Sequence, residues 1–176
     1  KAEVLSEWDE RCQAVTFNNL GCFYRKAGRP QAALSFLLKA QRIEARLPEK
    51  DVDRPADTFL NLCAVLSQLG RHSAALEHGQ SALILLQEEL FSGVNPLREE
   101  TSTPKADRIA VLAIAYHNIG VEQEVLKKFD QSLSSYRKGV EVADRYLGPN
   151  HSITVTLRNS CVAARRAIVA KDPQAR

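Results

Sequence analysis

Asparagine recurs at one position of a repeating pattern in this chain of 176 residues. The four asparagines each stand two residues before a small residue, and they are Asn19, Asn61, Asn118 and Asn159, before Gly21, Cys63, Gly120 and Cys161. An amide side chain both donates and accepts hydrogen bonds. A row of amides can therefore hold the backbone of an extended peptide, at about 0.5–1.5 kcal/mol for each bond. The pattern indicates non-covalent binding of a polypeptide.

The residue types that usually support catalysis are not arranged for it. No serine or cysteine has a base at a spacing that indicates nucleophilic catalysis, and neither G-x-x-x-x-G-K-[ST] nor G-x-G-x-x-G occurs. His117 adjoins the asparagine pattern and is a candidate ligand contact, although a half-buried helical histidine is its commoner role. The four cysteines form no C-x-x-C pair, which argues against a zinc site. The sequence therefore predicts no enzyme, no metal and no cofactor.

The composition is ordinary for a soluble globular protein, with 44% apolar and 26% charged residues. No apolar run approaches the roughly 18 residues of a membrane span. The net charge of +3 is small and spread along the chain, whereas nucleic-acid binding favours clustered basic residues. We therefore expect neither nucleic acid nor membrane as a partner. Reduced thiols favour a cytoplasmic location, and the start at Lys1 without Met indicates an excised piece.

Three segments of the chain align without gaps when Gly21, Cys63 and Gly120 are placed in register. An aromatic residue precedes this register position, and glycine or small residues follow it at fixed distances. The aligned residues are Phe17, Phe59 and Tyr116, then Gly28, Gly70 and the departing Lys127, then Ala33, Ala75 and Ser132, and finally Ala40, Ala82 and Gly139. Apolar residues at helical spacing on both sides of the turn predict two amphipathic helices in each segment.

This pattern resembles the tetratricopeptide repeat, a helix-turn-helix unit of 34 residues. The matched units are residues 14–47, 56–89 and 113–146. The linker "LGPNH" at residues 147–151 is similar to the linkers of kinesin light chains. The register spacing of 42 from Gly21 to Cys63 fits the longer period of that family, but the spacing of 57 from Cys63 to Gly120 does not.

The resemblance implies an all-α fold, a right-handed superhelical stack of about seven or eight helices. We expect residues 1–176 to form a single array, with an N-terminal helical extension or cap at residues 1–13. Gly, Pro, Ser and Thr predict an exposed loop at residues 91–107, and a capping helix is expected at residues 152–171. The N-terminal segment or the loop could also occupy the groove of the stack.

One face of the first helix of each repeat lines the concave side of such a stack. This face carries asparagine and small apolar residues where a solvated helix usually carries charges. The candidate partner-binding residues are Asn19, Asn61, Asn118, Asn159, Cys22, Lys26, Ala64, His117, Val121, Val125, Arg158, Val162 and Arg166. Asparagine ladders in related tetratricopeptide superhelices imply that the amides bind a partner's backbone. Local bonds to a neighbouring helix are the alternative.

The sequence thus predicts a protein–protein interaction module that binds an extended or helical segment of a partner, as a scaffold or adaptor. A chaperone adaptor is disfavoured, because Asn18 and Cys22 stand where that subfamily has the Lys and Asn of its carboxylate clamp. The alternative from another class is a self-assembling or spacer module of a larger cytoskeletal or ciliary complex. We expect a monomer or a weak homodimer.

The basic cluster at the end of the chain allows two interpretations. It comprises Arg165, Arg166 and Lys171, and it is either a solvated helix end or an attraction for an acidic partner.

Overall fold

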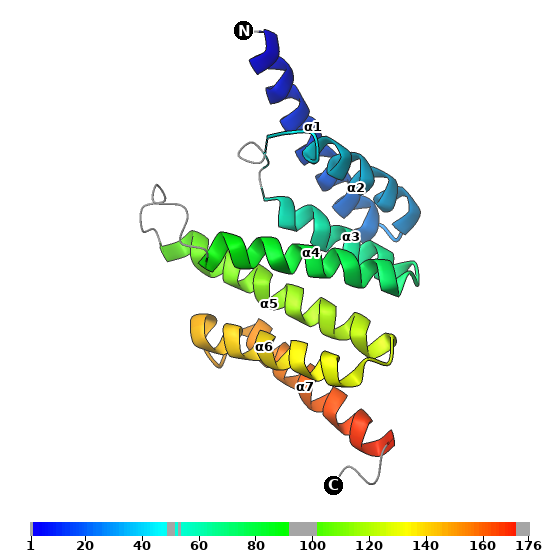
Figure 1. Ribbon diagram of the computed structural model, residues 1–176, viewed down its shortest axis with the longest axis vertical. Helices are drawn as coiled ribbons and strands as arrows, with labels where there is room; N and C mark the ends of the chain where they lie inside the picture. Colours follow the sequence, from blue (N-terminus) through cyan, green and yellow to red (C-terminus); the bar gives the residue numbers. More distant parts are fainter. Residues whose placement is uncertain (1, 49–51, 53, 92–101, 172–176) are drawn as a thin grey trace. The chain divides into compact units, whose positions relative to one another are not determined.

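The computed structural model describes residues 2–48, 52, 54–91 and 102–171 of the chain (Figure 1). These described residues form seven α-helices and no strand. The helices are α1 (Ala2–Lys26), α2 (Pro30–Glu44), α3 (Pro55–Gln68), α4 (His72–Phe91), α5 (Ser102–Val125), α6 (Phe129–Leu147) and α7 (Ser152–Lys171). The predicted all-α helical repeat fold is confirmed.

The helix bounds refine the sequence-based boundaries. Because α1 is continuous, the N-terminal segment extends the first repeat helix instead of forming a separate helix. α7 covers the range predicted for the capping helix. Of the predicted loop at residues 91–107, residues 92–101 lie outside the described part, Phe91 ends α4, and residues 102–107 already belong to α5. Pro104 fits there because the first amides of a helix have no intrahelical acceptor.

The chain divides into two compact units, Lys1–Ala82 (unit 1) and Leu83–Arg176 (unit 2). Unit 1 contains α1, α2 and α3, unit 2 contains α5, α6 and α7, and the division falls within α4. Each unit therefore combines a helical hairpin with the first helix of the next predicted repeat. The single array over residues 1–176 stays a prediction.

A left-handed backbone conformation ends the first helix of each predicted repeat. Gly28 and Gly70 have φ values of 70° and 72°, and Lys127 has φ of 60° at the equivalent position. The next amide donates back to the helix, as from Arg29 N to Tyr24 O at 2.9 Å, which is the Schellman arrangement. Glycine adopts this conformation without strain, whereas a residue with a Cβ atom costs about 1–2 kcal/mol.

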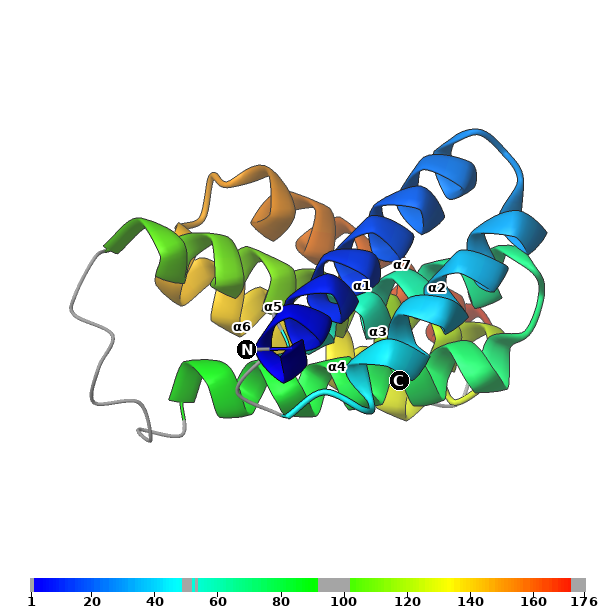
Figure 2. The same ribbon diagram turned by 90° about the horizontal axis from the view of Figure 1, so that it is seen from above.

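In unit 1, α1 and α2 lie side by side (Figures 1 and 2) and are tightly packed at Gly21. A Cβ atom on Gly21 would lie 2.5 Å from Cγ of Leu37. Leu37 is fully buried in a cluster that also contains Leu62 and Val65 of α3. The small residue at the register position thus lets the hairpin close, and the leucine it admits joins the hairpin to α3.

Unit 2 repeats this arrangement at Gly120 of α5. A Cβ atom there would lie 2.5 Å from the ring of Tyr136 on α6, and Ser132 Oγ donates to the Gly120 carbonyl oxygen at 2.9 Å. Tyr136 is buried with Leu157 and Ala164 of α7. α7 therefore completes the core of unit 2, as α3 completes that of unit 1.

Candidate functional site

The candidate residues form one strip in each unit. The α1–α3 strip consists of Val15, Asn19, Cys22 and Lys26 on α1 and Asp57, Asn61, Ala64 and Gln68 on α3. The α5–α7 strip consists of Ile114, Asn118, Val121 and Val125 on α5 and Val155, Asn159, Val162 and Arg166 on α7. Spacings of four, three and four residues keep each set on one face of its helix, and the two helices of each strip are in contact.

The α1–α3 strip has one exposed large apolar side chain, Val15 (47%), and is more polar than the α5–α7 strip. Asn19 and Lys26 are exposed, and Cys22, Asn61 and Ala64 are half-buried. Asn61 Nδ2 donates to Oδ1 of Asn18 at 3.0 Å, which links α3 to α1. A local bond therefore occupies one donor of Asn61, as the alternative interpretation of the asparagines expected, while Asn19 faces solvent.

The α5–α7 strip surrounds its asparagines with apolar side chains. Asn118 is half-buried and Asn159 is exposed. Four large apolar residues flank them with substantial exposure, namely Ile114 (40%), Val125 (50%), Val155 (43%) and Val162 (48%). Val121 is half-buried and packs against the core of unit 2. Single exposed apolar residues are normal, but here four lie on the same faces as two amides.

His117 lies beside the α5–α7 strip and links α5 to α7. Its Nε2 is 3.0 Å from Oγ of Ser160, and its ring centroid is 5.7 Å from that of Tyr136. Burial lowers the pKa of His117, and a hydrogen bond with the Asn118 side chain partly opposes this shift. His117 and Asn18 occupy the same repeat position, three residues before the register glycine. The His117–Ser160 pair is thus the counterpart of the Asn18–Asn61 bond.

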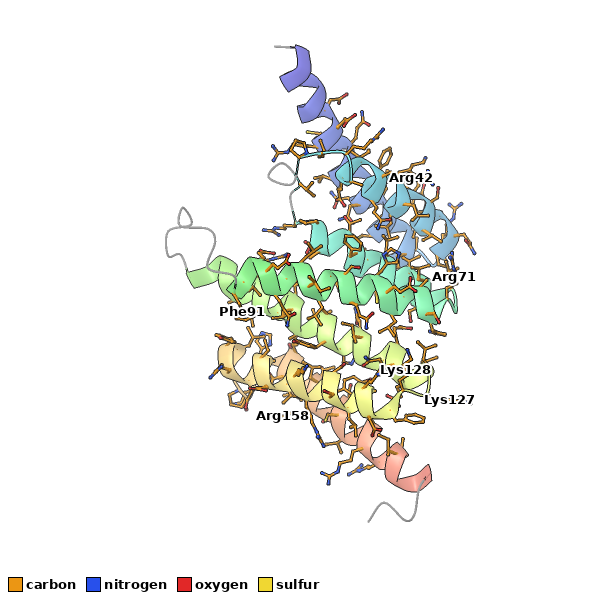
Figure 3. All side chains as sticks on the ribbon, in the orientation of Figure 1. Arg42, Arg71, Phe91, Lys127, Lys128 and Arg158 are labelled. Carbon is orange, nitrogen blue, oxygen red and sulfur yellow. The ribbon has the colours of Figure 1, made fainter. Side chains whose placement is uncertain are left out.

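The three basic candidate residues differ in whether they bond to the rest of the protein. Arg158, labelled in Figure 3, donates from Nη2 to Asp144 Oδ1 of α6 at 2.6 Å and from Nη1 to the Pro149 carbonyl oxygen at 3.2 Å. Its side chain remains 43% exposed. Lys26 and Arg166 are exposed, and neither has an ion-pair partner among the described residues.

The sequence pattern did not predict the Asn18–Asn61 and His117–Ser160 bonds, each of which joins two first helices. Asn18 and Ser160 were not among the candidate residues, because the spacing pattern identifies a face but not the residue of the next helix that it meets. A polar residue three positions before the register glycine, as at Asn18 and His117, is the sequence feature that could have predicted a bond to the next first helix.

The available chemistry in both strips is hydrogen bonding and apolar contact. Within the described ranges, no three His, Cys, Asp or Glu side chains gather where they could hold a metal ion. None of the described helices has the length and apolar character needed to cross a membrane. None of the four cysteines is in a disulfide within the described residues; Cys63 is buried and Cys12 is exposed.

Comparison with known proteins identifies the repeat. The sequence model of the tetratricopeptide repeat matches residues 12–88, which include the whole of α2 and α3. Residues 12–88 are therefore similar to tetratricopeptide repeats. Tetratricopeptide repeats form protein-interaction scaffolds, so a general role in protein–protein interaction is supported. No curated protein matches the sequence.

Among solved structures, BtubC (BKLC) from P. vanneervenii shares the fold, with a TM-score of 0.65 at 17% sequence identity. The alignment covers 86% of this chain and 54% of BtubC, so the chain spans about half the length of that protein. MamA (41-end) from Desulfovibrio magneticus RS-1 aligns over 91% of this chain and 97% of its own, at 14% identity. Its TM-score is 0.36, too low to indicate a shared arrangement of helices.

Proposed function

We propose that the α5–α7 strip binds an extended segment of a partner protein, with Asn118 and Asn159 bonding to the partner's backbone. The carrying observation is the placement of four half-exposed apolar side chains around two amides at equivalent positions of adjacent first helices. An extended segment offers backbone N–H and C=O groups to the amides and alternating side chains to the valines.

The free energies of apolar burial and of amide hydrogen bonding indicate how much each contributes to the affinity. Fully burying a valine or isoleucine side chain stabilises by about 1.5–3 kcal/mol, so covering the remaining half of each contributes roughly 1 kcal/mol. Each amide bond adds about 0.5–1.5 kcal/mol net. The apolar contacts therefore supply most of the affinity, and Asn118 and Asn159 set the position of the partner's backbone.

The α1–α3 strip has a lesser role in this proposal. Asn19 is free to bond to a backbone, and Lys26 provides a positive charge at the end of α1. Asn61 contributes chiefly through its acceptor, because a donor is bonded to Asn18. We propose that this strip contacts a polar part of the partner.

A binding function is favoured over a catalytic one. Within the described ranges, His117 bonds to the Ser160 hydroxyl, and His117 occupies the repeat position at which Asn18 bonds to the next first helix in unit 1. Because either an amide or an imidazole makes the bond to the next helix at this repeat position, the position serves to join helices and does not require a titratable base. A cytoplasmic location and association with a cytoskeletal or ciliary complex stay predictions from the sequence.

The experiment compares two sets of amide substitutions. The test variant carries Asn→Ala at Asn19, Asn61, Asn118 and Asn159, and the control carries Gln→Ala at Gln31, Gln80 and Gln131, which are exposed on second helices. Peptides are selected from a random display library with the natural chain, and their affinities for all three proteins are measured. We expect the test variant to weaken binding by about tenfold or more and the control to leave it unchanged.

Equal affinities of the natural chain and the Asn→Ala variant would contradict the proposal. Size-exclusion chromatography with light scattering tests the alternative of self-assembly. A stable dimer that loses all peptide binding on dimerisation would favour that alternative.

A further inference from the structure

One flank of each first helix receives the next first helix of its unit. On α1 this flank is identified by Asn18, which bonds to Asn61 of α3. On α5 it is identified by His117, which bonds to Ser160 of α7. Because Asn18 and His117 occupy the same repeat position, this position marks where a following helix packs.

Among the described residues, no helix following α7 packs on the same flank of α7. The repeat position of Asn18 and His117 is filled by Arg158 on α7, and Arg165 lies seven residues further along, about 10 Å up the same flank. Val162, which is 48% exposed, lies between them. The described packing partners of α7 are α5 and α6. The surface formed by Arg158, Val162 and Arg165 is called the α7 flank below.

The charge of α7 indicates what the α7 flank accepts. The helix contains four basic residues, Arg158, Arg165, Arg166 and Lys171, and its sequence contains no Asp or Glu. Asp144 of α6 compensates Arg158. Arg165 and Arg166 are exposed and have no ion-pair partner in the part of the chain that the structure describes. A guanidinium pairs best with a carboxylate through parallel hydrogen bonds.

We propose that the α7 flank binds an acidic amphipathic α-helix of a partner protein. The occupant is a helix because α3 and α7 themselves are the helices that pack on the equivalent flanks of α1 and α5. It carries carboxylates seven residues apart, toward Arg158 and Arg165, and a small or branched apolar residue between them, toward Val162. The α7 flank borders the α5–α7 strip and shares Val162 with it, but this interaction does not depend on the proposed binding of an extended segment.

The probe is a synthetic helical peptide of about 20 residues with Glu at two positions seven apart and Leu between them. The matched peptide has Lys at the two Glu positions. Binding is measured by fluorescence anisotropy with the whole chain, at low and high salt. We expect the Glu peptide to bind about tenfold or more tightly than the Lys peptide, with an affinity that falls as salt rises.

A charge swap locates the site. Arg165→Glu should weaken the binding of the Glu peptide by about tenfold and strengthen the binding of the Lys peptide. The control is Arg137→Glu, an exposed arginine on α6, which should change neither affinity. The double variant N118A/N159A should also leave the affinities for both peptides unchanged, which distinguishes binding at Arg158 and Arg165 from binding at the two amides. Far-UV circular dichroism confirms that each variant is folded.

Three results would overturn the proposal. They are equal affinities for the Glu and Lys peptides, equal losses in the Arg165 and Arg137 variants, and loss of binding in the N118A/N159A variant. Concentration-dependent dimerisation in sedimentation velocity that R165E abolishes would also overturn it, because the occupant would then be a second copy of the chain.

Discussion

Unit 1 and unit 2 follow one repeat pattern and expose different surfaces. Where the α1–α3 strip has Val15 and Asp57, the equivalent positions of the α5–α7 strip have Ile114 and Val155. Where α1 has Lys26, α5 has Val125. The asparagines are present in both units, so the amides alone do not distinguish the units. The flanking residues do, and they are the basis of the proposal that unit 2 offers apolar contacts to a partner and unit 1 mainly polar ones.

The residues where the helices of each hairpin touch differ less between the two units than the exposed residues do. Gly21 and Gly120 both lie against a large buried side chain of the following helix, which is Leu37 in unit 1 and Tyr136 in unit 2. The approach of the helices requires glycine in each case, while the residue opposite can be aliphatic or aromatic. Packing thus constrains the small residue and leaves its neighbour adaptable.

The largest expected effect compares these two glycines. Gly120→Ala places a Cβ atom 2.5 Å from the Tyr136 ring, which is 2% exposed, so the ring must shift within the core. We expect a loss of about 2–3 kcal/mol in the free energy of unfolding. Gly21→Ala should cost less, about 1–2 kcal/mol, because the Leu37 side chain, although fully buried, is smaller than the Tyr136 ring, so that its shift displaces fewer neighbours. Urea-induced unfolding measures both losses, and equal losses would contradict a dependence on the size of the opposing side chain.

The next effect concerns how each unit joins a second helix to the following first helix. In unit 2, Arg108 of α5 makes a bidentate ion pair with Glu89 of α4, at 2.6 Å for the shortest contact. In unit 1, Thr58 Oγ1 donates to Glu44 Oε1 at 2.8 Å. Glu89→Ala should cost about 2 kcal/mol, since it leaves the largely buried Arg108 without that carboxylate. Thr58→Val should cost about 1 kcal/mol.

Thermal unfolding of the two variants provides the comparison. The double variant R108M/E89L is the control, because replacing both members of a buried pair by apolar residues can restore stability. A larger loss for Thr58→Val than for Glu89→Ala would contradict the different strengths assigned to the two links.

Helices and their order could be predicted from the sequence because the determining signals are local. The register glycines, the turn residue Gly28 and the helical spacing of the apolar residues suffice to predict the hairpins. The strip residues follow from the same spacing. The bond between Asn18 and Asn61 could not be predicted, because it depends on the axial offset between two helices 43 residues apart. The division into two units likewise depends on long-range packing.

A smaller effect is expected where the two units differ in turn chemistry. Lys127 has φ of 60° at the position where Gly70 has φ of 72°. Lys127→Gly should therefore stabilise by about 1 kcal/mol, and Gly70→Lys should destabilise by a similar amount. Thermal unfolding of both variants measures the shifts. Opposite signs would support equivalent turns, whereas a destabilising Lys127→Gly would show that the lysine side chain makes a compensating contact.

The smallest effect is a pH dependence that unit 1 has at Glu44. Burial raises the pKa of the Glu44 carboxyl above its ordinary value of 4.5, the charge of Asp57 adds to the rise, and the Thr58 hydrogen bond partly opposes it. The folded chain therefore binds this proton more tightly than the unfolded chain. The free energy of unfolding should then fall as the pH rises above 4.5 and through the raised pKa.

Glu44→Gln removes the ionisable group and should remove this decline. The stability of the variant relative to the natural chain should rise between about pH 4 and pH 7, by less than about 1 kcal/mol because Glu44 is partly exposed to solvent. Urea-induced unfolding at several pH values measures this difference, with Glu141→Gln on the exposed face of α6 as the control. A constant difference across this range would mean that Glu44 ionises equally easily in the folded and unfolded chain. The link from α2 to α3 would then be as insensitive to pH as the bond between Asn18 and Asn61.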